Sequence, residues 1–374
     1  MEKVDKKLDL ITTIWNDYIF ESRFCQSRIN YTEEVKSNYY GDIMHYLSDT
    51  FDLIAFSEKE NNLQAEIFET TSVLQLIYVH QDLIEELLYI FKFDKGKLLA
   101  DCPYRKANRD IRNELVGHPI RRDKSTQNKL ISSVLYHPRP KLGQLEYVVY
   151  ESSNQFKGKD KSFEKKDIIL NHLNFLNKFF DLIIEKLSSI IHEYYKEHMN
   201  LLKVIESKTE FPKLVNYIEC KFEYLLKYDV LSEANDLTEL YNLKDQHLRF
   251  EYKLKTLQTD IEIMVIEKVQ WMEEFLKLES SRSLEIRKES LLKVEKEISK
   301  NFGTSQNSYP YQLGKLAGKH PVFTIEFFKR DFKKYDDIME ELRFMEINYE
   351  NQVKFNSAWK LLYKLVSEKV KAGH

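Results

Sequence analysis

The chain has 374 residues, enough for two domains, and its 9 glycines and 7 prolines are so few that the composition favours long helices over many short strands. With 43% hydrophobic and 31% charged residues, the sequence has the material for a core, which excludes a globally disordered chain. The net charge is only −3, but it is unevenly distributed: residues 1–91 hold 7 Lys and Arg against 17 Asp and Glu, whereas residues 92–166 hold 18 Lys and Arg against 9 Asp and Glu. The basic segment at residues 92–166 either binds a polyanion or forms a charged surface that pairs with the acidic N-terminal segment.

Helices are expected through the first third of the chain. Residues 8–24 carry apolar side chains at helical spacing, and the charges in the opening MEKVDKKLDLITTIW argue against a signal peptide. A longer helix is expected over residues 62–93, where the 3.6-residue period is kept. A third helix is expected over residues 103–116, because Pro103 suits a first turn and the sequence GHP follows at residues 117–119.

The convincing β signal lies at residues 129–151. KLISSVLYH and QLEYVVYES are rich in β-branched and aromatic residues, and the turn-forming PRPKLG separates them. We therefore expect a hairpin with strands at residues 129–137 and 144–151. The SSNQFKGKDKS that follows is expected to be a polar loop.

The rest of the chain is expected to be helical. Helical periodicity returns at residues 163–199, and a heptad-like apolar seam runs from residue 247 to residue 278. The seam predicts a long, coiled-coil-like helix that packs along another helix or along a partner. Residues 301–321 contain glycines and prolines and are expected to form a loop, followed by helices at residues 323–347 and 352–370.

These elements together predict a mainly α fold. Residues 1–200 would form a helical-bundle domain with the β-hairpin near residues 129–151 inserted in it. Residues 201–374 would form a second helical region that contains the long seam helix.

Several other classes of protein are excluded. No run of 18 apolar residues is present, so no membrane span is expected. The three cysteines, Cys25, Cys102 and Cys220, form no CxxC pair, which is typical of a reducing cytosol and predicts a cytoplasmic protein. In HEYYKEH, His192 and His198 are six residues apart and do not share the helix face that a zinc protease needs. No metal and no cofactor is expected.

Arg112 and His118 are the candidate catalytic residues. In an unbroken helix, side chains six residues apart point about 120° away from each other. We expect Gly117 to adopt a left-handed conformation and Pro119 to stop the helix, so that His118 can converge with Arg112. Arginine supplies a permanent forked charge for a phosphate, and histidine a group that titrates near neutral pH. The two are sufficient in kind for metal-free RNA cleavage, in which the 2′-hydroxyl attacks the neighbouring phosphate.

The surroundings of this pair resemble a known family. LQLIYVHQDLIEELLYIF at residues 74–91, followed by IRNELVGHP at residues 111–119, resembles the HEPN superfamily (higher eukaryotes and prokaryotes nucleotide-binding). Its ribonuclease members carry an Arg-x(4–6)-His motif, often with a polar residue directly after the arginine, as Asn113 is here. The Tyr-x-x-Gln-Asp pattern at residues 78–82 and the GHP ending are similar to uncharacterised bacterial HEPN proteins. The resemblance covers about residues 60–200.

The resemblance implies a helical bundle that dimerises so that two Arg/His motifs meet near the two-fold axis. Arg112 would then stabilise the phosphate charge, His118 would handle the proton or the leaving oxygen, and Asn113 would have an orienting or hydrogen-bonding role. The chain would be an endoribonuclease, a toxin or anti-phage effector, acting as a homodimer that a regulatory or antitoxin protein could restrain. RNA would be held without sequence preference by the basic residues that flank the motif, namely Arg105, Lys106, Arg109, Arg121, Arg122 and Lys124.

A second hypothesis stays open. Arg112 could pair with Asp110 or Glu114 on a solvated face, and His118 could simply cap a helix end. HEPN domains also include members that bind nucleotides or partner proteins without cleaving RNA, so the fold does not fix the activity. The chain would then be a non-catalytic helical interaction protein that recruits a partner through the seam at residues 247–278.

Overall fold

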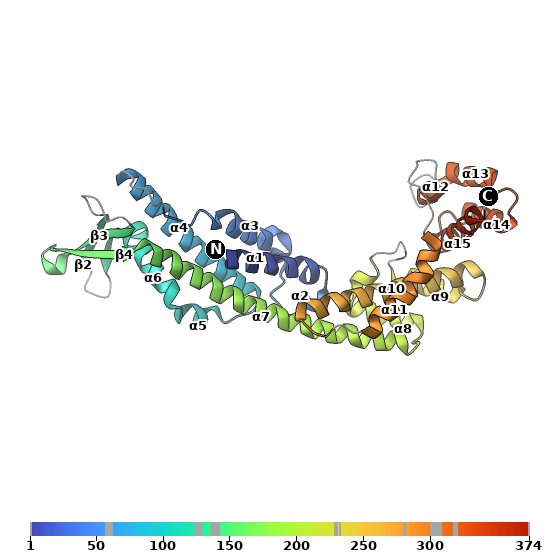
Figure 1. Ribbon diagram of the computed structural model, residues 1–374, viewed down its shortest axis with the longest axis horizontal. Coiled ribbons are helices and arrows are strands. Elements are labelled where there is room, and N and C mark those ends of the chain that lie inside the picture. The colour runs from blue at the N-terminus through green and yellow to red at the C-terminus, as the bar shows by residue number, and fades with distance from the viewer. Residues whose placement is uncertain are drawn as a thin grey trace. The chain divides into compact units, whose positions relative to one another are not determined.

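The computed structural model describes residues 2–56, 63–123, 129–135, 143–227, 231, 233–279, 282–299, 309–316 and 321–372. Over these residues the protein is mainly α-helical with one small antiparallel sheet, which confirms the predicted fold class (Figure 1). The chain divides into two compact units. The first holds Met1–Phe20 and Cys25–Ile190, and the second holds Glu21–Phe24 and Ile191–His374. The change of unit falls within the long helix α7 (Lys165–Glu206), whereas the sequence pattern places a domain boundary at residue 200.

Helix α4 (Leu63–Ile90) is the central helix of the first unit. It contains no glycine or proline, and its buried residues recur every three or four positions, so that one face points into the core. The helix expected over residues 103–116 begins at Pro103 as predicted, but it is α6 (Pro103–Arg112) followed by a π-helical turn, η3 (Asn113–Gly117). The other helical segments that precede the sheet in the chain are α1 (Glu2–Ile14), η1 (Trp15–Ile19), α2 (Arg23–Gln26), η2 (Val35–Tyr39), α3 (Tyr40–Phe51) and α5 (Lys95–Ala100).

The predicted hairpin is part of a larger sheet. Four antiparallel strands follow one another in the order β1 (Ile120–Asp123), β2 (Lys129–Leu135), β3 (Gln144–Glu151) and β4 (Gly158–Glu164). β2 and β3 are the hairpin strands, and the turn predicted between them lies outside the described residues. β1 was not expected, and β4 replaces part of the predicted polar loop after the short helical turn η5 (Ser152–Asn154). β4 carries lysines because it is an edge strand, and charge on an edge prevents pairing with other chains.

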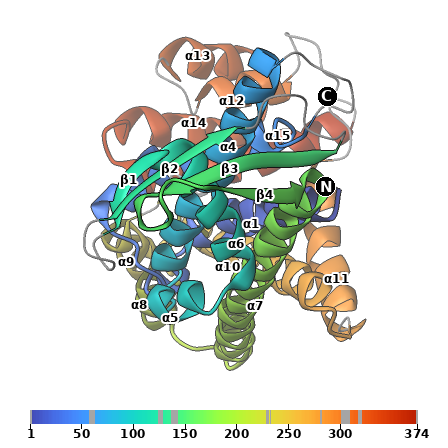
Figure 2. The ribbon, with the colours of Figure 1, turned by 90° about the vertical axis from the view of Figure 1, so that its left-hand side faces the viewer.

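The sheet packs through one face onto three helices of the first unit. Side chains alternate between the two faces of a strand, so that Leu145 and Tyr147 of β3 point the same way. They join a core cluster with Ile77 of α4, Ile111 of α6 and Ile168 of α7. Figure 2 shows the sheet lying across these helices. The Arg/His motif, which runs from the last residue of α6 to the segment before β1, is thereby held at both ends.

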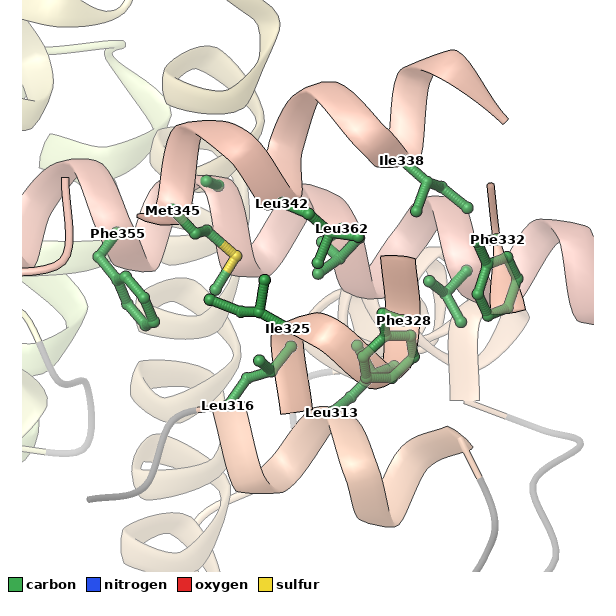
Figure 3. Close-up of a cluster of buried hydrophobic side chains, with 12 residues drawn as sticks. Leu313, Leu316, Ile325, Phe328, Phe332, Ile338, Leu342, Met345, Phe355 and Leu362 are labelled. Atoms are coloured by element: carbon green, nitrogen blue, oxygen red, sulfur yellow. The ribbon is translucent and has the colours of Figure 1, made fainter. Parts of the chain in front are cut away.

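In the second unit, four C-terminal helices enclose a core of their own (Figure 3). Phe328 and Phe332 pack there against Leu313, Leu342 and Leu362. The loop expected at residues 301–321 contains one of these helices, and the helix expected at residues 323–347 is divided in two. The elements of this unit are α8 (Phe211–Lys221), η6 (Glu223–Leu225), α9 (Ala234–Leu243), α10 (Leu248–Leu276), α11 (Arg282–Ser299), α12 (Tyr309–Leu316), α13 (Pro321–Asp331), α14 (Asp336–Ile347) and α15 (Gln352–Lys371).

The seam helix α10 packs along α15 of the same chain, so that its helical neighbour lies within its own unit. Up to Ile261 the buried apolar residues are those of the seam. Beyond it, Val265 and Val269 are buried, whereas Met264 and Trp271 are only half-buried. The buried face thus follows the 3.6-residue period of a straight helix and not the 3.5-residue period of a supercoil. None of the described helices combines the length and the apolar character that crossing a membrane requires.

Candidate functional site

The Arg/His motif is built on the π-helical turn η3. A π turn closes with a hydrogen bond over five residues instead of four, and such turns are frequent at functional sites. Here the amide of His118 donates to the carbonyl of Asn113 at 2.8 Å. The extra residue changes which positions lie above one another, and it places Gly117 against Arg112.

The guanidinium of Arg112 is fixed by three side chains. Its Nε and Nη2 donate to Oε1 of Gln75 at 3.3 and 3.0 Å, and its Nη1 donates to Oδ1 of Asn113 at 3.2 Å. Its Cζ lies 3.9 Å from the centroid of the Tyr78 ring, which is a cation–π contact. A guanidinium has five N–H donors, and these bonds use three, so that two remain for an anion.

Gly117 is required by the close approach of Arg112. A Cβ atom at this position would lie 2.5 Å from Nη1 of Arg112 and 3.2 Å from its Cζ. The left-handed conformation expected for Gly117 is wrong, because its backbone belongs to the π turn and, of the described glycines, Gly143 is the one with a positive φ. The bend at the end of α6 therefore comes from the wide turn, and the glycine makes room for the guanidinium.

His118 stands directly after the π turn, with backbone angles that leave the helix. Its side chain is exposed, and within the described part of the chain its imidazole forms no hydrogen bond or ion pair. Its carbonyl accepts a hydrogen bond from Nη1 of Arg121 at 3.3 Å. The side chains of Arg112 and Asn113 are thus brought together, whereas His118 is joined to the turn through its backbone amide and its side chain is exposed to solvent.

Two of the residues expected to hold RNA are engaged with α4. Nη2 of Arg105 lies 3.2 Å from Oε2 of Glu85, and Nη2 of Arg109 lies 2.6 Å from Oδ1 of Asp82. Cζ of Arg109 also lies 4.2 Å from the centroid of the Tyr78 ring on which Arg112 packs. The Arg105 and Arg109 side chains are only 22% and 17% exposed, so their main contacts join α6 to α4.

Two of the other expected RNA contacts lie at the surface. Lys106 on α6 and Arg122 on β1 are exposed. Arg121 is half-buried, and its Nη2 lies 3.6 Å from Oε1 of Glu114. Lys124 lies outside the described residues.

A cleft of about 680 Å³ opens beside the motif, among α6, η3, β3, β4 and the start of α7, and both Asn113 and Arg121 line it. Glu114 in its wall accepts hydrogen bonds from Nζ of Lys161 at 2.7 Å and from the hydroxyl of Tyr147 at 2.6 Å. Burial raises the pKa of Glu114, but these hydrogen bonds outweigh it and hold the pKa below its ordinary value. Glu114 is therefore an ionised partner of Lys161. The second hypothesis allowed Glu114 to pair with Arg112, but the two side chains form no ion pair.

One group of side chains in the second unit has the spacing of metal ligands. Among the described residues, only His247, Glu340 and Glu341 bring three ligand atoms within 4.8 Å of one another. Nη2 of Arg249 lies within 3.3 Å of an atom of each of them, and Nε of Arg249 donates to Glu341. The positive charge among these three side chains is thus the guanidinium of Arg249. His247 also caps α10, since its Nδ1 accepts from the Arg249 amide, so the histidine expected in the seam has a structural role.

The sequence pattern assigns no role to Gln75 or Tyr78, the residues that hold Arg112. A usable signal is present, because Gln75, Tyr78, Asp82 and Glu85 recur at spacings of three and four along one side of the helix. A polar stripe of this kind needs partners when it faces a core. Arg105, Arg109 and Arg112 on α6 also recur at spacings of three and four. The two matching patterns together predict that α6 pairs with α4.

A scan against protein-family models finds no match, and neither do searches of curated proteins and of solved structures. The resemblance to HEPN proteins therefore stays a prediction that is based on the motifs at residues 74–91 and 111–119.

Proposed function

We propose that the protein is a metal-independent endoribonuclease of the HEPN type, in which Arg112 and His118 act on a phosphodiester of RNA. The observation that supports the proposal is that the Arg112 guanidinium is fixed in place and still has N–H donors available. Gln75, Asn113 and Tyr78 fix its guanidinium, yet two N–H donors remain. A preorganised cation beside an exposed histidine is what stabilisation of a phosphoryl transition state requires.

The reaction is the attack of the ribose 2′-hydroxyl on the adjacent phosphorus. The bond from phosphorus to the 2′-oxygen forms, and the bond to the 5′-oxygen of the next nucleotide breaks. One proton leaves the 2′-hydroxyl and one is delivered to the 5′-oxygen, giving a 2′,3′-cyclic phosphate and a 5′-hydroxyl. Arg112 would neutralise the charge on the non-bridging oxygens, and His118 would transfer a proton. Asn113 would keep Arg112 aligned.

A homodimer would complete the site. An in-line displacement needs a base on the side of the attacking oxygen and an acid on the side of the leaving oxygen. His118 of one chain can serve one of these positions, and His118 of a second copy would serve the other. A site composed in this way makes activity depend on dimerisation.

RNA would approach over the exposed Lys106 and Arg122, with Arg121 beside the motif. We place the activity in the cytoplasm, because none of the cysteines Cys25, Cys102 and Cys220 forms a disulfide. A ribonuclease that can cut the RNA of its own cell is harmful to that cell, so its role would be that of a toxin or phage-defence effector restrained by a regulatory protein. The second hypothesis, a non-catalytic interaction protein, has less support from the seam, because α10 packs along α15.

The test is RNA cleavage in excess EDTA by wild type, Arg112→Ala and His118→Ala, with the oligomeric state of each measured by light scattering. We expect both substitutions to lower the rate by about 10²-fold or more while the dimer persists. His45→Ala is the matched control, because His45 is an exposed histidine elsewhere in the first unit. Equal rates in all four proteins would show that the activity is a contaminant and would remove the catalytic assignment.

A further inference from the structure

We propose that the cleft beside the motif binds a guanine base of the RNA substrate. The inference rests on the proposed function, since the base would belong to the nucleotide whose phosphate lies at Arg112. The cleft has the size of a small-molecule site, at about 680 Å³. It is joined to the motif through Asn113, which contacts Arg112, and through Arg121, which contacts the His118 carbonyl.

The cleft offers an aromatic surface. Phe163 lines it and is only partly buried, and its ring is stacked on that of Tyr147 at 5.9 Å with an interplanar angle of 14°. Tyr147 also lines the cleft and is 1% exposed, so that its buried ring holds Phe163 in place. Proteins that recognise unpaired RNA bases stack them on such rings and read their edges by hydrogen bonds.

The charges of the lining exclude a phosphate and favour hydrogen-bond donors. Four carboxylates and two cations line the cleft, and both cations, Arg121 and Lys161, lie against Glu114. Within the described part of the chain, the carboxylates of Asp110 and Asp167 have no hydrogen bond or ion pair. Ionised carboxylates are acceptors only, so a ligand must bring N–H groups to them. The phosphate would stay outside the cleft, at Arg112.

Guanine matches this requirement better than the other bases. Its Watson–Crick edge presents two neighbouring donors, N1–H and N2–H, which one carboxylate can accept together. Adenine and cytosine present one amino group beside an acceptor, and uracil presents a single N–H between two carbonyl oxygens. A uracil in the cleft would leave its carbonyls facing carboxylates.

A divalent cation is a poorer occupant. Among the described residues, the carboxylates of the cleft do not form a group of three ligand atoms within 4.8 Å of one another. A cation would also leave the exposed face of Phe163 without a contact. Both features are accounted for by a base with donor groups.

The test is calorimetric titration of the full-length His118→Ala protein with guanosine 5′-monophosphate and with uridine 5′-monophosphate. Neither nucleotide contains an internucleotide phosphodiester, so binding is measured without turnover, and the substitution also prevents cleavage of any RNA that is carried over. We expect the guanine nucleotide to bind at least about tenfold more tightly, and Asp110→Asn and Asp167→Asn to weaken it by about tenfold each. Asp160→Asn is the control, because Asp160 is an exposed carboxylate on β4 that does not line the cleft.

Equal affinity for the two nucleotides, no binding of either, or no effect of the two cleft substitutions would overturn the proposal. The outcome is separable from that of the proposed function. Guanine binding without any RNA cleavage by wild type would keep the base site and remove the nuclease. Cleavage by wild type with no preference for guanine would do the reverse.

Discussion

At the scale of single residues, Gly117 is the position that most directly links packing to the proposed chemistry. A methyl group there would meet the end of Arg112 at 2.5 Å, so the guanidinium must move while the rest of the turn can stay. A displacement of about 1 Å at a reacting group can cost about 10²-fold in rate. We therefore expect Gly117→Ala to lower the RNA cleavage rate by about that factor, with less than about 1 kcal/mol of change in the free energy of unfolding.

Gly41→Ala is the control for this substitution, because a Cβ at Gly41 meets nothing within 4 Å. It should leave the cleavage rate unchanged and raise the free energy of unfolding by up to about 1 kcal/mol, because alanine is the better helix former in α3. Wild-type cleavage by Gly117→Ala would mean that the observed position of Arg112 is not needed for activity.

The residues of the motif could be found from the sequence, but their surroundings could not. Arg112, Asn113 and His118 stand in a pattern of fixed spacing. The wide turn that arranges them has no signature in the local sequence, so the bend was attributed to a left-handed Gly117. The partners of Arg112 come from α4, and only the polar stripe of that helix indicates them.

At the scale of elements, the buried group at Arg249 joins α10 to α14. Its guanidinium donates to both oxygens of Glu341 at 2.9 Å, and the two side chains are 6% and 2% exposed. Burial raises the pKa of Glu341, so the carboxylate depends on the arginine to stay ionised. We expect Arg249→Met to lower the free energy of unfolding by about 3–5 kcal/mol, because it leaves a buried charge without its partner.

The measurement is urea unfolding, with Lys6→Met as the comparison. Lys6 pairs with Glu2 on the surface, where both side chains are more than 70% exposed, and such pairs contribute less than about 1 kcal/mol. Adding Glu341→Gln to Arg249→Met should recover part of the loss. An Arg249→Met protein as stable as Lys6→Met would show that this pair does not hold the two helices together.

Elements were predictable where one physical signal dominates. Long runs without glycine or proline and with a 3.6-residue period gave α4, α7 and α10. The strands β1 and β4 were missed because β1 has four residues and β4 presents charges along the edge of the sheet. The boundaries of α12 and α13 differ from the prediction, because prolines there stand in the first turns of helices, where they are tolerated, whereas the sequence pattern indicates a loop.

At the scale of the whole molecule, stability should depend on buried neutral histidines. His80 and His172 are both 0% exposed and share a contact of 3.2 Å between ring nitrogens, and His198 is likewise buried. Burial lowers the pKa of His80 from 6.5 to about 4 and that of His198 to about 3, and burial and the neighbouring His80 lower the pKa of His172. Below pH 6.5 the unfolded chain therefore binds protons that the folded chain does not, and the folded state loses stability as the pH falls.

From pH 7 to pH 5, His80 alone should lower the free energy of unfolding by about 2 kcal/mol. His80→Gln should show a correspondingly smaller difference between the two pH values in urea unfolding, whereas His45→Gln, at an exposed position, should show the wild-type difference. An identical pH dependence in wild type and His80→Gln would contradict the buried neutral state.

The central claim is that RNA is cut by its own 2′-hydroxyl at the Arg112 and His118 site, and the product ends test it most directly. The measurement is end-group analysis of a short RNA incubated with the dimeric protein in EDTA, beside the same RNA with one 2′-deoxy nucleotide at the preferred cleavage position. We predict 2′,3′-cyclic phosphate and 5′-hydroxyl ends, and no cut after the deoxy nucleotide. Products with 5′-phosphate and 3′-hydroxyl ends, or cleavage after the deoxy nucleotide, would contradict the account.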